Sequence, residues 1–203
     1  MEPVCLPYAD VRPQIHSGDL LLCSGSSVMS RMIQHSTGSS YSHVAFILRV
    51  EPLDRLVVLE SVESMGIRAC TLGSYVFDYN GTALPYPGRI YVGRHAHVDL
   101  RDEDLRHRFS RTALDLLGYP YGTKDIMDIT MRIVGAKLGM GTRPTRNDKT
   151  FICSEFAALV YESIDVHIPF NRLHYIAPSD FANCPDVTVL WEIDLTSPTL
   201  LEP

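Results

Sequence analysis

The sequence predicts an α+β fold in which helices pack on an antiparallel sheet. Two apolar segments of strand length, 42–50 and 55–62, are separated by the turn-forming residues 51–54, a pattern typical of a β-hairpin. Segments 102–117 and 151–164 instead carry apolar residues at helical spacing. A hairpin combined with separate helices indicates the α+β class.

Shorter segments complete the predicted order of elements. We expect a strand at 20–23, a helix at 28–33, and further strands at 89–92 and 187–191. Glycine and proline are frequent in 67–88, so this stretch is predicted to be irregular, with one short strand at most. Because the chain shows no internal repeat, a single domain over residues 1–203 is the simplest organisation, with residues 1–17 as a leader of mixed polarity.

Composition and charge narrow the function classes. The chain has 203 residues, of which 45% are hydrophobic and 21% charged, enough apolar material for a well-filled core. Lys and Arg number 18 and Asp and Glu number 24, and the net charge of −6 argues against general affinity for nucleic acid or anionic lipid. No apolar run approaches the ~18 residues of a membrane helix, and the N-terminus lacks a secretory signal pattern. We therefore expect a cytoplasmic protein with no nucleic-acid partner and no membrane-spanning segment, and its oligomeric state stays open.

The cysteine pattern favours free thiols. Their number, five, is odd, and no close CxxC pair of a zinc ribbon occurs. A disulfide framework is not expected in a chain of this size without an export signal. The five thiols are Cys5, Cys23, Cys70, Cys153 and Cys184.

Cys153 is the first candidate for chemistry, because it lies at the start of the predicted helix 151–164. The positive end of a helix and its free backbone N–H groups stabilise a thiolate, and the same N–H groups can receive an oxyanion. The alternative is a buried structural cysteine. Positive charge from Arg143, Arg146 and Lys149 precedes Cys153, either as a help to the thiolate or as part of a solvated loop.

His43 and Glu60 form the second candidate, one on each strand of the predicted hairpin. A four-residue turn pairs Val50 with Arg55, which places Glu60 diagonally opposite His43 on one face, at roughly 7–8 Å between Cα atoms. A carboxylate in that position can hold the imidazole tautomer that accepts a thiol proton. If a bulge shifts the register, Ser61 takes this face instead. The alternatives are a structural histidine and a glutamate on a solvent-exposed face.

Five short motifs follow one another along the chain: Gly18-Asp19, Tyr41-Ser42-His43-Val44, Leu59-Glu60-Ser61, Gly118-Tyr119-Pro120-Tyr121 and Ile152-Cys153-Ser154-Glu155. In this order they resemble the permuted papain-like amidases of the YiiX/YaeF type, which are circularly permuted relatives of the NlpC-type cell-wall peptidases. The order here is histidine, polar residue, cysteine, as in the permuted group. The resemblance extends from about residue 18 to about residue 181, where Pro178-Ser179-Asp180 resembles a turn of the family.

The resemblance implies a papain-like fold in permuted order and a cysteine hydrolase, an amidase or thiol peptidase that works through an acyl-enzyme. It implies Cys153 as nucleophile, His43 as general base and Glu60 as the orienting acid. Candidates for binding substrate or the oxyanion are Tyr41, Ser154 and Tyr121. It implies neither a cofactor nor a metal.

Two features leave the substrate open. Segment 122–150 is long for the resemblance and is expected to be an insertion that forms a lid or wall of the site. The absence of an export signal weakens the case for peptidoglycan, so peptides, peptidoglycan fragments and acyl or lipid substrates all remain. The alternative activity is that of a thiol acyltransferase or lipid esterase of the lecithin:retinol acyltransferase-like branch, where a second histidine typically replaces Glu60. A further alternative is a non-catalytic binding module on the same fold.

Three polar residues, His95, His97 and Asp99, alternate along the chain and would share one face of a strand. They could hold a metal, but an exposed polar face is the expected interpretation. We also interpret the four cysteines other than Cys153 as inert, since no acid–base pattern accompanies them. The remaining histidines are interpreted as surface or structural residues; they are His16, His35, His107, His167 and His174.

Overall fold

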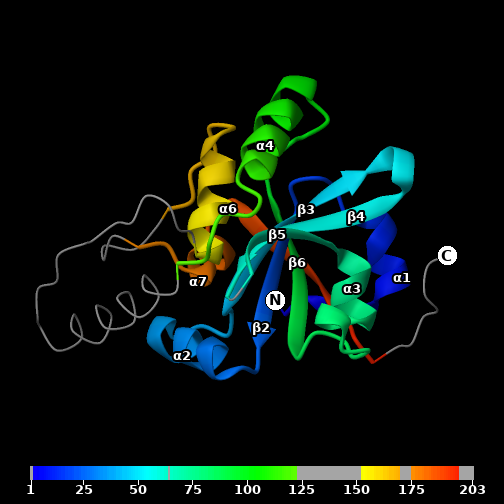
Figure 1. Ribbon diagram of the computed structural model, residues 1–203, viewed down its shortest axis with the longest axis vertical. Coiled ribbons are helices and arrows are strands. Elements are labelled where there is room, and N and C mark those ends of the chain that lie inside the picture. Colours follow the sequence, from blue (N-terminus) through cyan, green and yellow to red (C-terminus); the bar gives the residue numbers. More distant parts are fainter. Residues whose placement is uncertain (1, 64, 123–151, 170–174, 197–203) are drawn as a thin grey trace, which may run out of the picture.

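The computed structural model describes residues 2–63, 65–122, 152–169 and 175–196, which form a seven-stranded sheet flanked by helices (Figure 1). The strands are β1 (Val4–Pro7), β2 (Leu20–Gly25), β3 (His43–Val50), β4 (Arg55–Val62), β5 (Gly66–Thr71), β6 (Gly88–His95) and β7 (Val187–Asp194). Their order across the sheet is β1-β7-β6-β2-β3-β4-β5, and all neighbours are antiparallel except β1 and β7. The predicted α+β class is therefore confirmed.

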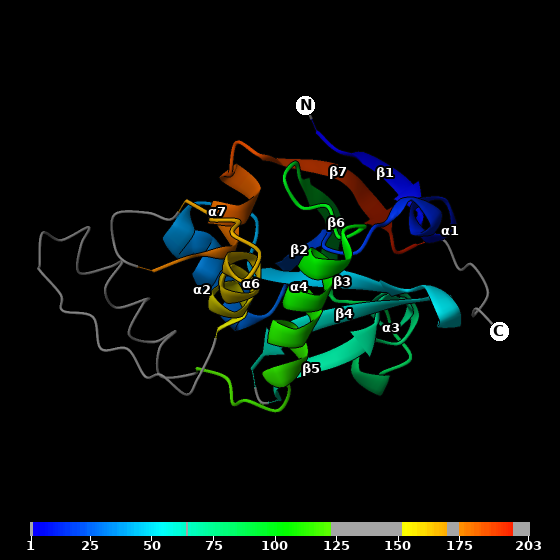
Figure 2. The ribbon, with the colours of Figure 1, turned by 90° about the horizontal axis from the view of Figure 1, so that it is seen from above.

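Helices cover both faces of this sheet. They are α1 (Tyr8–Val11), α2 (Val28–Thr37), α3 (Leu72–Phe77), α4 (Glu103–Asp115), α6 (Cys153–Glu162) and α7 (Pro178–Asn183), with short 3-10 turns η1 (Arg12–Gln14), η2 (Glu51–Leu53) and η3 (Tyr79–Gly81). Figures 1 and 2 show α4, α6 and α7 on one side of the sheet and α1 and α3 on the other. Within the described ranges, none of the helices has the length and apolar character needed to cross a bilayer.

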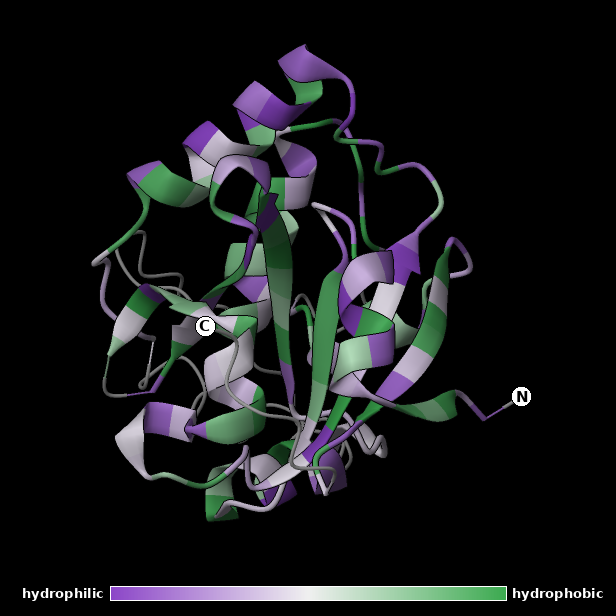
Figure 3. Cartoon of the chain, turned by 90° about the vertical axis from the view of Figure 1, so that its right-hand side faces the viewer, coloured by the Kyte–Doolittle hydropathy of each residue, from purple (hydrophilic) through white to green (hydrophobic). Residues whose placement is uncertain are grey.

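Strand alternation explains why two cores form. In β2, Leu20 and Leu22 belong to the core beneath α4 and α6, whereas Leu21 and Cys23 belong to the core on the α1 and α3 side. Successive side chains of a strand point to opposite faces, so a nearly continuous apolar strand is buried from both sides. In Figure 3 the outer surface of α4, at the top, is mostly hydrophilic, whereas the central strands are hydrophobic.

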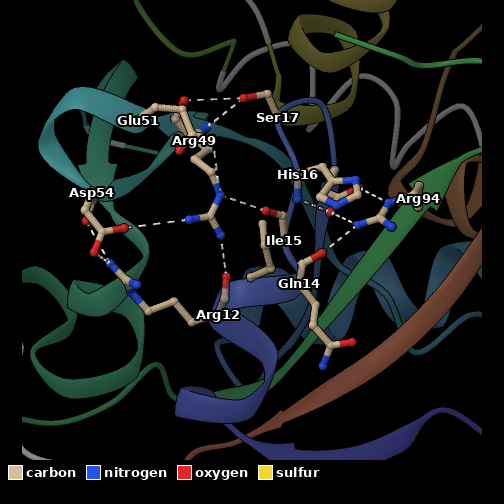
Figure 4. Close-up of polar contacts among 10 residues, drawn as sticks. Arg12, Gln14, Ile15, His16, Ser17, Arg49, Glu51, Asp54 and Arg94 are labelled. Atoms are coloured by element: carbon tan, nitrogen blue, oxygen red, sulfur yellow. Dashed lines mark hydrogen bonds and ion pairs between the residues drawn. The ribbon is translucent and has the colours of Figure 1, made fainter. Parts of the chain in front are cut away.

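The segment 1–17 differs from the predicted leader, because residues 4–14 form β1, α1 and η1. Strand β1 pairs in parallel with β7, from the far end of the sequence, and Tyr8, Val11 and Ile15 are buried in the second core. Polar contacts also hold this segment against β3 (Figure 4): the Arg49 guanidinium donates to the carbonyl of Ile15 at 3.0 Å and to that of Arg12 at 2.5 Å. The segment therefore belongs to the sheet rather than preceding it.

The hairpin prediction is confirmed in register. Val50 pairs with Arg55, and the pairing continues without a bulge to Phe46 opposite Leu59. The stretch 67–88 is more regular than predicted, since it contains most of β5 as well as α3. Nearly all of the predicted insertion 122–150 lies outside the described residues.

Candidate active site

The N-terminus of α6 positions Cys153. Apolar residues that include Phe156 and Val160 bury one side of α6 against β3 and β4, and this burial fixes the helix axis. The Glu155 carboxylate accepts a hydrogen bond from the backbone N–H of Ile152 at 3.3 Å, which caps the first turn. Cys153 is therefore the first residue of a well-anchored helix, and its side chain is buried within the fold.

The structure brings His43 and Glu60 into direct contact with one another and His43 into contact with Cys153. His43 Nε2 lies 2.7 Å from Glu60 Oε2, as the diagonal position on the hairpin predicts. Cys153 also lies close enough to His43 for the interaction between the two side chains to raise the pKa of the ring. Because Nε2 is taken by Glu60, Nδ1 is the ring nitrogen left to face the thiol. The three side chains thus form one series of interacting groups from α6 to the β3–β4 hairpin.

Electrostatics favour the protonated form of His43. Burial lowers the pKa of the ring, but the charge and hydrogen bond of Cys153 and those of Glu60 outweigh it and raise the pKa to about 10. A protonated imidazole beside a sulfur atom favours the thiolate by simple charge attraction. A positively charged imidazole is therefore the expected neighbour of the Cys153 sulfur at neutral pH.

Glu60 is buried, and its two carboxylate oxygens are fully engaged. Arg68 binds Oε1 through Nε at 2.8 Å and Nη2 at 2.7 Å, and the Tyr75 hydroxyl donates to Oε2, the oxygen that also contacts His43. Burial raises the pKa of this carboxyl, but the interactions with His43, Arg68 and Tyr75 reverse the effect and lower it. Glu60 is therefore an ionised acid held in a fixed orientation.

Arg68 and Tyr75 are site residues that the sequence did not reveal. Arg68 lies directly opposite Glu60 in the β4–β5 pairing, so extending the hairpin pattern by one more strand would have found it. Tyr75 lies on α3 and packs against Tyr79 and Tyr86, with ring centroids 5.0 and 5.5 Å apart. Burial raises the pKa of Tyr75, so its hydroxyl keeps its proton and acts as a donor.

The three residues predicted to bind substrate or the oxyanion are placed differently from one another. Tyr121 is close enough to Cys153 for the thiolate charge to add to the effect of burial in raising the tyrosine pKa. Tyr41 instead packs edge-to-face on Tyr91, and the charges that act on it come from β6 and β7. The buried Ser154 hydroxyl donates to the carbonyl of Ile176 at 2.7 Å. This bond ties α6 to the segment before α7, which leaves Tyr121 as the residue of the three beside the thiol.

Backbone contacts explain the position of Tyr121. The motif that contains it runs alongside β5, where Ile67 exchanges hydrogen bonds with Gly118 and Tyr119, each at 2.9 Å. Gly66 has φ +74°, and a Cβ atom there would come within 2.1 Å of the Tyr119 carbonyl oxygen. Only glycine therefore permits this approach of the two segments.

Two cysteines have more polar surroundings than the sequence suggested. Cys70 Sγ lies 3.7 Å from Glu60 Oε1, and burial together with this negative charge raises the pKa of its thiol to about 12. Cys184 lies beside His95 and Asp186, an acid–base setting that the sequence pattern did not indicate. The contact of Cys184 with His95 could not be read from the sequence because it joins segments that only the tertiary fold brings together, whereas the contact of Cys70 with Glu60 lies on the neighbouring strands β4 and β5.

Comparison with known protein families identifies the family of this chain. The family model described as "Permuted papain-like amidase enzyme, YaeF/YiiX, C92 family" matches residues 14–200. The chain belongs to this family. The resemblance and the permuted papain-like fold expected from the five motifs are thereby confirmed, and with them the general assignment to the papain-like amidases.

A solved structure supports the same fold. The chain is similar to a protein described as the metalloprotein YiiX from Escherichia coli O157:H7, with a TM-score of 0.61 and 18% sequence identity. The similarity covers 88% of this chain and 99% of that one. The search of curated proteins finds no match to this chain. At this identity the likeness to the solved structure concerns the fold alone.

Proposed function

We propose that this member of the permuted papain-like amidases is a cysteine hydrolase that cleaves an amide bond through Cys153, His43 and Glu60. The observation that carries the proposal is the series of interacting side chains from Cys153 at the N-terminus of α6, through His43, to Glu60, which contacts His43 Nε2 at 2.7 Å. This combination supplies a nucleophile, a proton carrier and an orienting acid.

The chemical steps follow from the protonation states. The Cys153 thiolate attacks the amide carbonyl carbon, and backbone N–H groups of the first turn of α6 stabilise the oxyanion. His43 transfers its proton to the leaving nitrogen, so the amine departs and an acyl-thioester remains on Cys153. The neutral His43 then takes a proton from a water molecule, whose oxygen attacks the thioester. Collapse of this second intermediate releases the carboxylic acid and restores the imidazolium–thiolate pair.

Glu60 acts on His43 rather than on the substrate. Its ionised carboxylate accepts a hydrogen bond from the Nε2–H group, which orients the ring and leaves Nδ1 toward the sulfur. Arg68 and Tyr75 prevent the carboxylate from rotating away, since each holds one of its oxygens. Tyr121 lies near the thiol and is assigned to the wall of the substrate site.

Selective labelling of the thiols tests the nucleophile without knowledge of the substrate. At about pH 6, iodoacetamide is expected to alkylate Cys153 first, and His43→Ala is expected to slow that reaction by tenfold or more. Cys5 is the internal control, because it is exposed but has no imidazole partner and its thiol pKa is raised. Peptide mapping by mass spectrometry gives the order of modification.

Acyl trapping on Cys153, combined with the labelling experiment, separates the enzyme from the other functions. Trapping an acyl group on Cys153 with amide substrates, and its absence in Cys153→Ala, supports the amidase. An acyl-enzyme formed only from esters or lipids favours the acyltransferase or esterase alternative. If Cys5 reacts first and Cys153, reached by the reagent, is indifferent to His43→Ala, the chain is a binding module and the proposal fails.

A further inference from the structure

A second cluster of reactive side chains lies at the other end of the described fold, where β6 meets the connection from α7 to β7. His95 is the last residue of β6, Cys184 directly follows α7, and Asp186 directly precedes β7. One ligand atom from each residue lies within 4.8 Å of those of the other two. Figure 2 shows α7 leading into β7 beside β6, so the three residues come from adjoining elements.

The backbone around this cluster is firmly held. His95 pairs with Val187 in the sheet, and the backbone N–H of Ala96 donates to the carbonyl of Asp186 at 2.8 Å. His95 and Cys184 are each 3% exposed, whereas the Asp186 side chain reaches solvent at 51%. The fold therefore fixes the positions of His95 and Cys184, whereas the Asp186 side chain can move.

His95 has an unused polar atom at this position. Its Nδ1 accepts a hydrogen bond from the backbone N–H of His97 at 3.2 Å, while its buried Nε2 has no hydrogen-bond partner among the described residues. Buried polar atoms are almost always paired, so an unpaired nitrogen on a ring that lies within reach of a thiol and a carboxylate calls for a ligand.

We propose that His95, Cys184 and Asp186 bind a divalent transition metal, with Zn²⁺ as the best match. A nitrogen, a sulfur and an oxygen ligand form the mixed set that zinc accepts, and a thiolate disfavours magnesium and calcium. His97 supplies the nearest further ligand, since its Nε2 lies 3.6 Å from Asp186 Oδ1. Coordination through His95 Nε2 moves the ring proton to Nδ1, so one long hydrogen bond is exchanged for a metal bond.

The distances between the ligand atoms are compatible with a site that contracts slightly when the metal binds. Tetrahedral zinc, with bonds of about 2.0–2.3 Å, keeps its ligand atoms about 3.3–3.8 Å apart. The observed limit of 4.8 Å requires a movement of roughly 1 Å, which the exposed Asp186 side chain can make by rotation. Asp99, which alternates with His95 and His97 in the sequence, instead pairs with Arg101 at 2.6 Å and takes no part.

The metal would brace the fold rather than perform the hydrolysis. The His95 ring packs edge-to-face on Tyr161, which lies eight residues after Cys153 on α6, or about 12 Å of helix. A metal here joins the end of β6 to the α7–β7 connection, segments about 90 residues apart in the chain. Its binding would stabilise the native state by ligand linkage.

Titration of the metal-free full-length protein with Zn²⁺ and with Co²⁺ tests this proposal. We expect one equivalent to bind, a rise in the unfolding midpoint, and a thiolate-to-cobalt charge-transfer band. Asp186→Asn should weaken binding by roughly tenfold or more, and Cys184→Ser should remove the band. The matched control is Asp99→Asn, since Asp99 is an acid of similar exposure outside the cluster.

Cys153→Ser separates this site from the hydrolytic thiol. Binding that persists in Cys153→Ser and weakens in Asp186→Asn supports the proposal. Binding that disappears in Cys153→Ser, or that is unchanged in both Asp186→Asn and Cys184→Ser, overturns it, as does the lack of saturable binding by the unmodified protein. If Cys184→Ser fails to fold, the exposed Asp186→Asn decides alone, with circular dichroism as the check of its fold.

Discussion

Two buried carboxylates form similar ion pairs that have different roles. Glu60 lies on β4, and Asp19 lies just before β2. Asp19 is 2% exposed and accepts two hydrogen bonds from the Arg94 guanidinium, each at 2.7 Å, and one from the backbone N–H of His16 at 2.8 Å. Glu60 is also held by an arginine, Arg68, but it has His43 as an additional partner.

The difference lies in whether a partner can change its charge. A guanidinium stays protonated at all accessible pH values, so the Asp19–Arg94 pair is a fixed brace at the start of β2. The imidazole of His43 can gain and lose a proton, and this ring also touches a thiol. The geometry of a buried acid therefore indicates function only when a titratable group and a nucleophile complete it.

The largest expected effect is that of Glu60→Gln on turnover. The glutamine amide can present its NH₂ group to His43 instead of an acceptor oxygen and cannot balance the imidazolium charge, so kcat/KM should fall by about 10³–10⁴-fold. Steady-state kinetics on a substrate that acylates Cys153 measure this effect, with the folded fraction determined in parallel. Full activity of Glu60→Gln combined with loss of activity in Ser61→Ala would reassign the third member of the site.

Asp19→Asn should lower stability and leave turnover unchanged, the opposite of the effect expected for Glu60→Gln. The change leaves the Arg94 guanidinium without its counter-charge and should lower the free energy of unfolding by about 2–3 kcal/mol, while the folded molecules keep their activity. Denaturant unfolding and kinetics below the unfolding transition measure the two quantities. A fall in kcat of the folded protein as large as that of Glu60→Gln would remove the distinction between the two carboxylates.

Arg68→Lys should have a smaller effect, because one of two contacts to Glu60 Oε1 survives. A lysine retains the charge but cannot hold the oxygen through two nitrogens, so we expect roughly a tenfold fall in kcat with little change in KM. The alkaline limb of the pH profile should also shift, which a purely structural role would not produce. An unchanged profile would mean that Arg68 contributes to folding only.

The pH dependence of stability is the most gradual effect. The folded-state pKa of His43, about 10, exceeds the ~6.5 of an unfolded histidine. The contribution of His43 to the free energy of unfolding is therefore complete below about pH 6.5 and is lost as the pH rises toward 10. The lowered pKa of Glu60 gives a contribution that is present above about pH 4.3 and is lost in acid.

The single proton of His43 can contribute at most about 1.4 kcal/mol per pH unit to the slope of the free energy of unfolding against pH. Denaturant unfolding between about pH 6 and pH 9.5 should show this alkaline decline in the unmodified protein and a weaker one in His43→Gln. The Asp19–Arg94 pair should contribute nothing to this alkaline decline. Asp19→Asn should therefore lower the free energy of unfolding by the same amount at each pH, without changing its slope against pH. Equal slopes in the unmodified protein and His43→Gln would contradict the His43 assignment.

Local patterns in the sequence determined the hairpin, its register and the chemistry placed on it. The four-residue turn and the period of two fix which residues share a face, so the contact between His43 and Glu60 followed from residues 43–60 alone. The helical spacing of 151–164 likewise placed Cys153 at a helix start. These predictions succeeded because neighbours in the chain decide them.

Only the tertiary structure decided what surrounds those residues. The segment 1–17 became part of the sheet because β7, far along the chain, offered a strand edge and the second core offered burial for Tyr8 and Val11. Arg68 and Tyr75 reached Glu60 through a strand and a helix in a stretch rich in glycine and proline, and His95 met Cys184 across about 90 residues. Periodicity reports which face of an element is apolar, but the partner of that face is chosen by burial over the whole chain.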